Sequence, residues 1–260
     1  MKKSDLIKFL NDYLNVKDFA SDPSVNGLQV EGKDEINVIA TAADVSLDSI
    51  DWALEVGADA LLVHHGLLWQ GDDRTITGSF KDRLNALLEA DLNLIAYHLP
   101  LDAHTEVGNN AFLCSLLGEG RTDFIVPGDK SSIAMRKELL HGLSISSICA
   151  TLCKALDCRV GILGNVNDDL LIKDIAICSG SGGFVLDKCR HPDFDALITG
   201  EINEQTYHAA VESGTVVFMV GHHASEQDGV RLLGNKLASK FDLTHHHLHF
   251  AYEKNISWFE

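Results

Sequence analysis

The segment that most restricts the fold is Ala60-Leu61-Leu62-Val63, four apolar residues followed by His64-His65-Gly66. A short apolar run of this kind is typical of a strand inside a parallel sheet covered on both faces. Side chains alternate along a strand, so two adjacent histidines can both lean over the sheet edge only where the strand ends. Ligands of open α/β sheets bind at that edge. The pair is therefore a candidate ligand pair, and the alternative is one capping and one solvated histidine.

Length and charge limit the class of protein. The 260 residues suffice for one large domain or two ordinary ones. A net charge of −17 without a basic run disfavours binding to nucleic acid. Apolar residues at positions 6, 7, 9, 10 and 14 indicate an amphipathic helix rather than a signal peptide, and no apolar run approaches the roughly 18 residues of a membrane span. We expect a cytoplasmic protein without a membrane segment.

Strand-type and helix-type segments alternate through the first half of the chain. Ser46 is a good N-cap for a helix that Gly57 would end. The expected strands are residues 36–43, 59–63 and 92–97, and the expected helices are residues 47–56, 79–90 and 109–117. This order predicts a parallel sheet wound with helices.

The second half of the chain resembles the first. Asp195-Ala196-Leu197-Ile198 matches Asp59-Ala60-Leu61-Leu62 at an offset of 136 residues, which places Gly200-Glu201 where the first half has His64-His65. Periodicity lapses at residues 126–130. We therefore predict two related α/β domains with mostly parallel sheets: a metal-binding domain of residues 1–126 plus 220–260, and a second domain of residues 127–219. The alternative is that any two parallel-sheet halves look alike.

Imidazole and carboxylate groups collect at the expected strand ends. They are His64, His65, His98, Asp102, His104, Glu201, His222, His223 and Glu226. His222 and Glu226 would share one face of a helix, and Asp102 follows Pro100 in an expected loop. Nitrogen and oxygen ligands without thiolate suit zinc, iron or manganese. The number of groups exceeds what one tetrahedral ion needs and fits two ions joined by a carboxylate and a water.

Five motifs in this order resemble those of the Nif-three-like (YbgI-type) family, whose members carry the name GTP cyclohydrolase I type 2 homologue. They are Pro23-Ser24-Val25-Asn26-Gly27-Leu28-Gln29-Val30, Val63-His64-His65-Gly66, His98-Leu99-Pro100-Leu101-Asp102, Ile198-Thr199-Gly200-Glu201 and Gly221-His222-His223-Ala224-Ser225-Glu226. The resemblance implies a toroidal homohexamer with internal pairs of divalent metal ions. It implies the ligands His64, His65, Asp102, His222 and Glu226, with Asp102 and Glu226 as bridges. His98 and Glu201 match positions near the metals, and we assign them proton transfer or orientation of the ligands, with direct metal coordination as the alternative.

Two further segments attract attention. The loop Ser179-Gly180-Ser181-Gly182-Gly183 follows an expected strand, and its N–H groups are candidates to cradle a phosphate, although tight turns also explain such glycines. The tract from His245 to His249 alternates like a final strand with a histidine-bearing face. We expect solvated histidines there rather than a metal site.

Two functions from different classes fit the sequence. The first is a dinuclear-metal-dependent hydrolase acting on a nucleotide or another phosphorylated small molecule, as the family name GTP cyclohydrolase implies, with His98 and Glu201 moving protons. The second is a ring-shaped adaptor or regulatory protein that binds metals without turnover. Threading of DNA through the ring ranks last because of the charge.

Overall fold

The computed structural model describes residues 1–73, 75–126, 132–164, 166–167, 169–187 and 193–250. These residues divide into two compact units. The first unit contains residues 1–101 and 227–250, and the second contains residues 102–226. The boundary expected near residues 126–130 lies largely outside the described residues, and residues 102–126 belong to the second unit.

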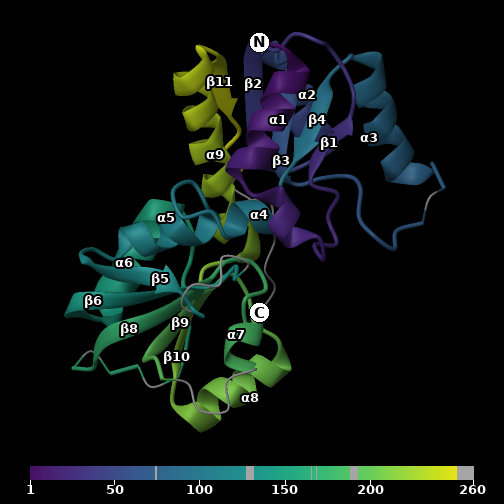
Figure 1. Ribbon diagram of the computed structural model, residues 1–260. Helices are drawn as coiled ribbons and strands as arrows, with labels where there is room; N and C mark the ends of the chain where they lie inside the picture. Colours follow the sequence, from purple (N-terminus) through teal and green to yellow (C-terminus); the bar gives the residue numbers. More distant parts are fainter. Residues whose placement is uncertain (74, 127–131, 165, 168, 188–192, 251–260) are drawn as a thin grey trace. The chain divides into compact units, whose positions relative to one another are not determined.

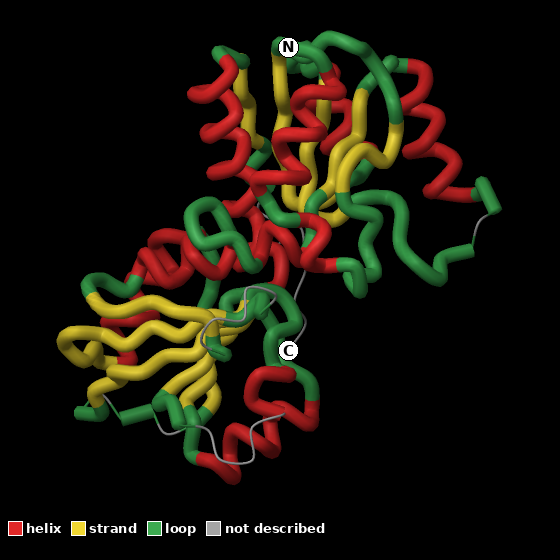
Figure 2. Tube along the Cα trace, in the orientation of Figure 1, coloured by secondary structure: helices red, strands yellow, loops and turns green. Residues whose placement is uncertain are grey.

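The first unit is built on a sheet of five described strands (Figures 1 and 2). Their order across the sheet is β1 (Gly27–Val30), β4 (Asn93–Ala96), β3 (Ala60–His65), β2 (Val38–Asp44) and β11 (Thr244–His247). All neighbours are parallel except β1 and β4. The central position of β3 explains its unbroken apolar run, because both of its faces are covered.

Helices cover this sheet. They are α1 (Lys3–Tyr13), the 3-10 turn η1 (Val16–Phe19), α2 (Leu47–Glu55), α3 (Gly78–Glu89) and most of α9 (His222–Phe241). The predicted cap of α2 is confirmed, since the Ser46 hydroxyl accepts from the Ser49 N–H and Gly57 has a φ of +70°. α2 and α3 share a core with the strands, and α1 lies beside α9 through an edge contact of Phe9 with Phe241.

The second unit is built on a mixed sheet of six described strands. Their order is β5 (Gly120–Phe124), β6 (Met135–Ser144), β8 (Leu171–Cys178), β9 (Ala196–Thr199), β10 (Val216–Met219) and β7 (Gly161–Leu163). Only β8, β9 and β10 are mutually parallel. The prediction of a mostly parallel sheet is therefore wrong for this unit. β6 was missed because Lys137 occupies a buried position in its alternating pattern, where an apolar residue is expected.

Short helices complete the second unit. They are α5 (Asn109–Leu116), α6 (Ile145–Leu156), α7 (Phe184–Asp187) and α8 (Glu204–Ser213), while the single turn α4 (Leu99–Asp102) crosses from the first unit. Leu113 and Cys114 of α5 pack in the same core as Ile175 of β8. This packing explains why residues 102–126 belong to the second unit.

The parallel strands of the two units have the same register. Ile39 pairs with Ala60 in the first sheet, and Ile175 pairs with Ala196 in the second, both at the offset of 136 residues. The third strands begin opposite Ala60 at Asn93 and opposite Ala196 at Val216. Neither unit contains, within the described residues, a helix long and apolar enough to cross a membrane.

Candidate metal centre

Three histidines gather at the carboxyl ends of β3 and β4 in the first unit. His64 and His65 are the last residues of β3, so the strand continues two residues further than expected, and His98 follows β4. One ring nitrogen of each lies within 4.8 Å of the others. The rings of His64 and His65 are 4.5 Å apart between centroids. Adjacent strand residues thus meet at this edge, as the sequence predicted.

Each of these rings is oriented through its Nδ1 atom. His64 Nδ1 lies 3.0 Å from the Tyr97 carbonyl oxygen, which can only accept, so Nδ1 carries the proton. His65 Nδ1 lies 2.8 Å from Asp44 Oδ1, and the register pairs these two residues across β2 and β3. In a neutral ring held in this way the lone pair is on Nε2. Histidine ligands of metals are characteristically oriented by such partners.

His98 is held by a buried carboxylate that sequence reasoning missed. Asp22 is 1% exposed, and its Oδ1 accepts from His98 Nδ1 at 2.8 Å and from the Ser24 N–H at 2.9 Å. Its Oδ2 accepts from Asn26 Nδ2 and the Leu99 N–H. Burial by itself raises the pKa of Asp22, but the hydrogen bonds from His98, Asn26 and Ser24 outweigh it and lower the pKa below its usual value.

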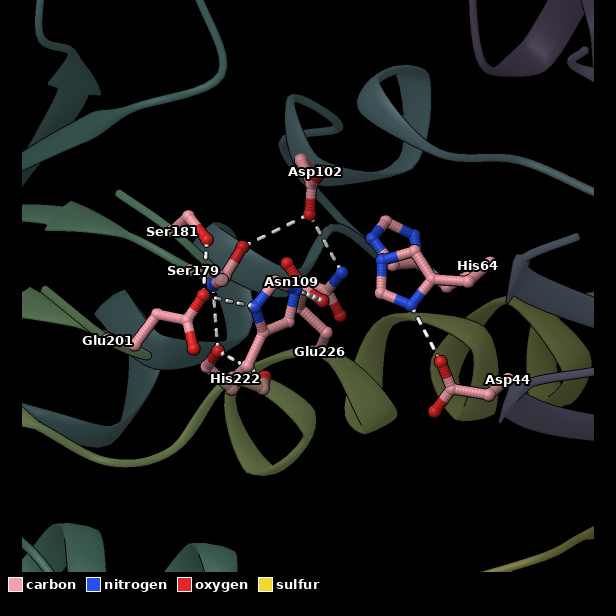
Figure 3. A network of polar contacts seen from close by, with 12 residues as sticks. Asp44, His64, Asp102, Asn109, Ser179, Ser181, Glu201, His222 and Glu226 are labelled. Atoms are coloured by element: carbon pink, nitrogen blue, oxygen red, sulfur yellow. Dashed lines mark hydrogen bonds and ion pairs between the residues drawn. The ribbon is translucent and has the colours of Figure 1, made fainter. Parts of the chain in front are cut away.

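A buried carboxylate in the second unit is also held by neighbours (Figure 3). Asp102 ends the single turn α4, whereas a loop was expected. Its Oδ1 accepts from Asn109 Nδ2 at 2.8 Å and from the Ser179 hydroxyl at 3.1 Å. Asn110, next on α5, accepts the Ser179 N–H at 2.7 Å. The start of α5 and the glycine loop therefore fix the Asp102 carboxylate together.

His222 lies between two carboxylates of the same unit (Figure 3). Its Nε2 is 3.0 Å from Glu226 Oε2, one helical turn along α9 as the i, i+4 spacing predicted, and its Nδ1 is 3.1 Å from Glu201 Oε1. The bond to Glu226 raises the pKa of His222 to about 9 against the opposing effect of burial, and Glu201 adds to the rise. Hydrogen bonds from Ser181 and His222 lower the pKa of Glu201.

The glycine loop is explained by packing. The N–H groups of Ser179, Gly180 and Gly182 donate to Asn110, Ser225 and Thr199. A Cβ atom on Gly180 would overlap Oε1 of Glu226, and one on Gly182 would overlap the Cys178 carbonyl. These three N–H groups are engaged within the protein, which favours the alternative that the glycines serve a tight turn.

The histidine tract forms a structured network. β11 pairs with β2, and the buried Thr41 hydroxyl lies 2.8 Å from His245 Nε2 and 2.9 Å from His247 Nδ1. His245 Nδ1 lies 2.9 Å from Asn235 Oδ1. Burial lowers the pKa of both histidines to about 4. The expectation of solvated side chains is therefore wrong for His245 and His247.

Two other histidines make local contacts. His104 Nδ1 accepts from the N–H groups of Glu106 and Val107 in a turn. The largely exposed His208 lies 4.0 Å from Glu204 on α8. The structure thus gathers His64, His65 and His98 in the first unit, and Glu201, His222 and Glu226 in the second. It adds Asp22, Asp44, Asn109 and Ser179. Two of these had a sequence signal, since Asp44 is a polar residue at the end of a neighbouring strand and Ser179 begins the glycine loop.

Both clusters fit a transition metal by the chemistry of their donors. They offer imidazole nitrogen and carboxylate oxygen, the ligand types of zinc, iron and manganese sites, at buried or half-buried positions except for the exposed Glu201. The Nδ1 partners of the histidines supply the orientation that such sites require.

Known proteins resemble this chain over almost its whole length. The "GTP cyclohydrolase 1 type 2 homolog" of Escherichia coli K12 is 40% identical over 250 residues, covering 94% of this chain and 96% of that protein. The homologue of the same name from Haemophilus influenzae is 39% identical over 243 residues, covering 93% and 95%. The solved structure of protein ybgI, described as of unknown function, superimposes with a TM-score of 0.88 at 35% identity, covering 96% and 98%.

A second solved structure, TTHA1606 from Thermus thermophilus, gives a TM-score of 0.86 at 35% identity and covers 96% of this chain and 98% of that one. These similarities support the mixed α/β fold with two sheets. The family described as Duf34/NIF3 (NGG1p interacting factor 3) matches residues 1–256. Since the match spans nearly the whole sequence, the chain belongs to the Duf34/NIF3 family.

Proposed function

We propose that the protein is a dinuclear-metal-dependent hydrolase that acts on a nucleotide-like substrate. The residues that would hold the two ions are His64, His65, Asp102, His222 and Glu226, and Asp102 and Glu226 would be shared between them. Divalent zinc, iron or manganese bound there would supply Lewis-acid activation of water and substrate. We place the protein in the cytoplasm.

The observation that carries this proposal is the orientation of the histidines. Three rings at one sheet edge each use Nδ1 for a carbonyl or carboxylate partner. Such an arrangement fixes the tautomer and the ring orientation that a histidine ligand needs. Asp102 and Glu226 are also the residues at which the chain passes into and out of the second unit.

The remaining polar groups have roles that follow from their partners. His98, backed by Asp22, would accept or deliver a proton at Nε2 while Asp22 holds the ring in place. Glu201 would orient His222 through Nδ1 and is itself held by the Ser181 hydroxyl. The names of the bacterial relatives support a guanine nucleotide as the first substrate to test.

The test combines metal content with turnover. Protein purified without added metal is expected to contain about two transition-metal ions per chain by elemental analysis, and to release formate from GTP. His64→Ala should lose both properties, whereas the matched control His208→Ala, on an exposed face of α8, should keep them. Metal-loaded protein that releases neither formate nor phosphate from GTP would contradict the proposed activity.

A second candidate is a metal-binding ring without turnover, with the homohexamer that the family resemblance implies. The mass in solution of the wild type and of His64→Ala separates the two functions. Dissociation or unfolding of the variant would assign the metals a structural role, whereas an intact assembly without turnover would assign them a catalytic one.

A further inference from the structure

A cavity of about 180 Å³ lies in the second unit beside the His222 cluster. Glu201 belongs to both, because it lines the cavity and contacts His222 Nδ1 at 3.1 Å. Typical pockets for drug-sized ligands measure roughly 300–1,000 Å³, so this one accommodates a single ring system rather than a whole nucleotide.

The polar lining of this cavity offers acceptors. Asp187 Oδ1 is buried and has no hydrogen-bond partner among the described residues. The hydroxyls of Ser181 and Thr206 donate to Glu201 and Asn203, so their protons are already used. A buried carboxylate oxygen without a donor costs free energy of folding, which a ligand N–H group would recover.

The remaining lining selects the shape and charge of the ligand. Phe184 and Ile202 contribute apolar surface, which suits a planar ring. Among the described residues, none of those lining the cavity is lysine or arginine, so a phosphate would have no counter-charge there. A carboxylate accepts two neighbouring N–H groups in parallel.

We propose that this cavity binds the heterocycle of the substrate through paired N–H groups donated to Asp187, the pattern that the N1–H and 2-amino groups of guanine present. This assignment rests on the proposed function and makes it more specific. The phosphates would lie outside the cavity, and the ring would lie next to Glu201.

Nucleosides test the assignment without any turnover. Equilibrium dialysis of the full-length protein should rank guanosine above inosine, which lacks the 2-amino group, and above adenosine, whose N1 is an acceptor. A bidentate contact predicts a preference of about tenfold or more. Equal binding of the three nucleosides, or no binding, would overturn the proposal. Binding of guanidinium without binding of any nucleoside would overturn it too, because the ring would then play no part.

The Asp187→Asn variant gives a change of specificity rather than a loss. Its amide offers one acceptor and one donor, which match the N1–H and C2 carbonyl of xanthine, so xanthosine should now bind better than guanosine. The control Glu212→Gln, an exposed position on α8 with the same change of charge, should keep the preference for guanosine. Unaltered specificity in Asp187→Asn would contradict the assignment. Selective nucleoside binding without release of formate would disprove the proposed activity but leave this site standing.

Discussion

Oδ1 of Asp22 lies 2.8 Å from Nδ1 of His98, and the other oxygen of the same carboxylate accepts the N–H of Leu99. The buried side chain of Asp22 therefore fixes both the His98 ring and the backbone that follows β4. Four donors converge on this carboxylate, which explains how its charge is tolerated where it is 1% exposed.

The first prediction concerns this carboxylate. Asp22→Asn replaces one acceptor oxygen by an amide that faces other donors, so we expect a loss of roughly 2–4 kcal/mol in the free energy of unfolding at pH 7. Urea denaturation measures it. Asp12→Asn, an exposed position on α1, should change the value by less than about 0.5 kcal/mol. Because folding lowers the pKa of Asp22, its contribution is present above the ordinary value of 3.8 and is lost as the pH falls through the folded-state pKa.

The second prediction concerns Gly180. A Cβ atom there would overlap Glu226 Oε1, and φ is +60°, so Gly180→Ala should displace Glu226 and reduce the bound metal. Gly57→Ala is the matched control, since its φ is +70° but no atom lies within 4 Å of the added Cβ. Both variants should lose about 1–2 kcal/mol of stability from the backbone alone. Metal content measured by elemental analysis should fall only in Gly180→Ala, and equal metal content in both would refute a role for this close approach.

The third prediction concerns the proton on His222. With a pKa of about 9, the ring is protonated in metal-free protein at pH 7, and a metal can bind it only after that proton leaves. Metal binding at pH 7 should therefore release about one proton from His222, and the release should disappear above pH 9. Calorimetry in buffers of different ionisation enthalpy measures it.

The same pKa determines how the stability of the metal-free protein changes with pH. Folding raises the pKa of His222. The contribution of this residue to the stability of the metal-free protein is therefore complete below about pH 6.5 and declines as the pH rises through about 9. Glu201→Gln removes one of the two carboxylate partners, so it should shift the loss of proton release to lower pH. If the number of protons released on metal binding depended on pH in the same way in that variant as in the wild type, the assigned pairing of Glu201 with His222 would be contradicted.

The fourth prediction concerns the hydroxyl between His245 and His247. Thr41→Val removes the partner of both rings and should lower the free energy of unfolding by about 1–3 kcal/mol at pH 7. In the wild type both rings are neutral when folded, with pKa values of about 4. Unfolded histidines bind protons below about 6.5, so stability should decrease as the pH falls from 6.5 towards 4. A wild type equally stable at pH 7 and pH 5 would count against buried, neutral rings.

Local signals predicted much of the first unit and one contact of the second. Ser46 and Gly57 bound α2, and the apolar run of β3 lies at the centre of its sheet. The meeting of His64 with His65 and of His222 with Glu226 followed from strand ends and helical spacing. These features depend on neighbours in sequence or on the general geometry of parallel sheets.

Long-range partners could not be predicted in the same way. Asp22 and His98 are 76 residues apart, and Ser179 and Asp102 are 77 residues apart. β6 has an antiparallel partner on each side and buries Lys137, so its sequence lacks the apolar signal of a central strand. Only pairing across the fold determines such elements.

The position of β11 in the chain affects the order in which the two sheets can be completed during synthesis. This strand pairs with β2, and the bond between Thr41 and His247 spans 206 residues. Residues 102–226 are continuous and can form their sheet while the residues after 226 are still being translated. The first sheet, in contrast, leaves the edge of β2 uncovered until residues 244–247 have been synthesised. Nascent chains interrupted before residue 244 should therefore expose this edge to chaperones or to other strands.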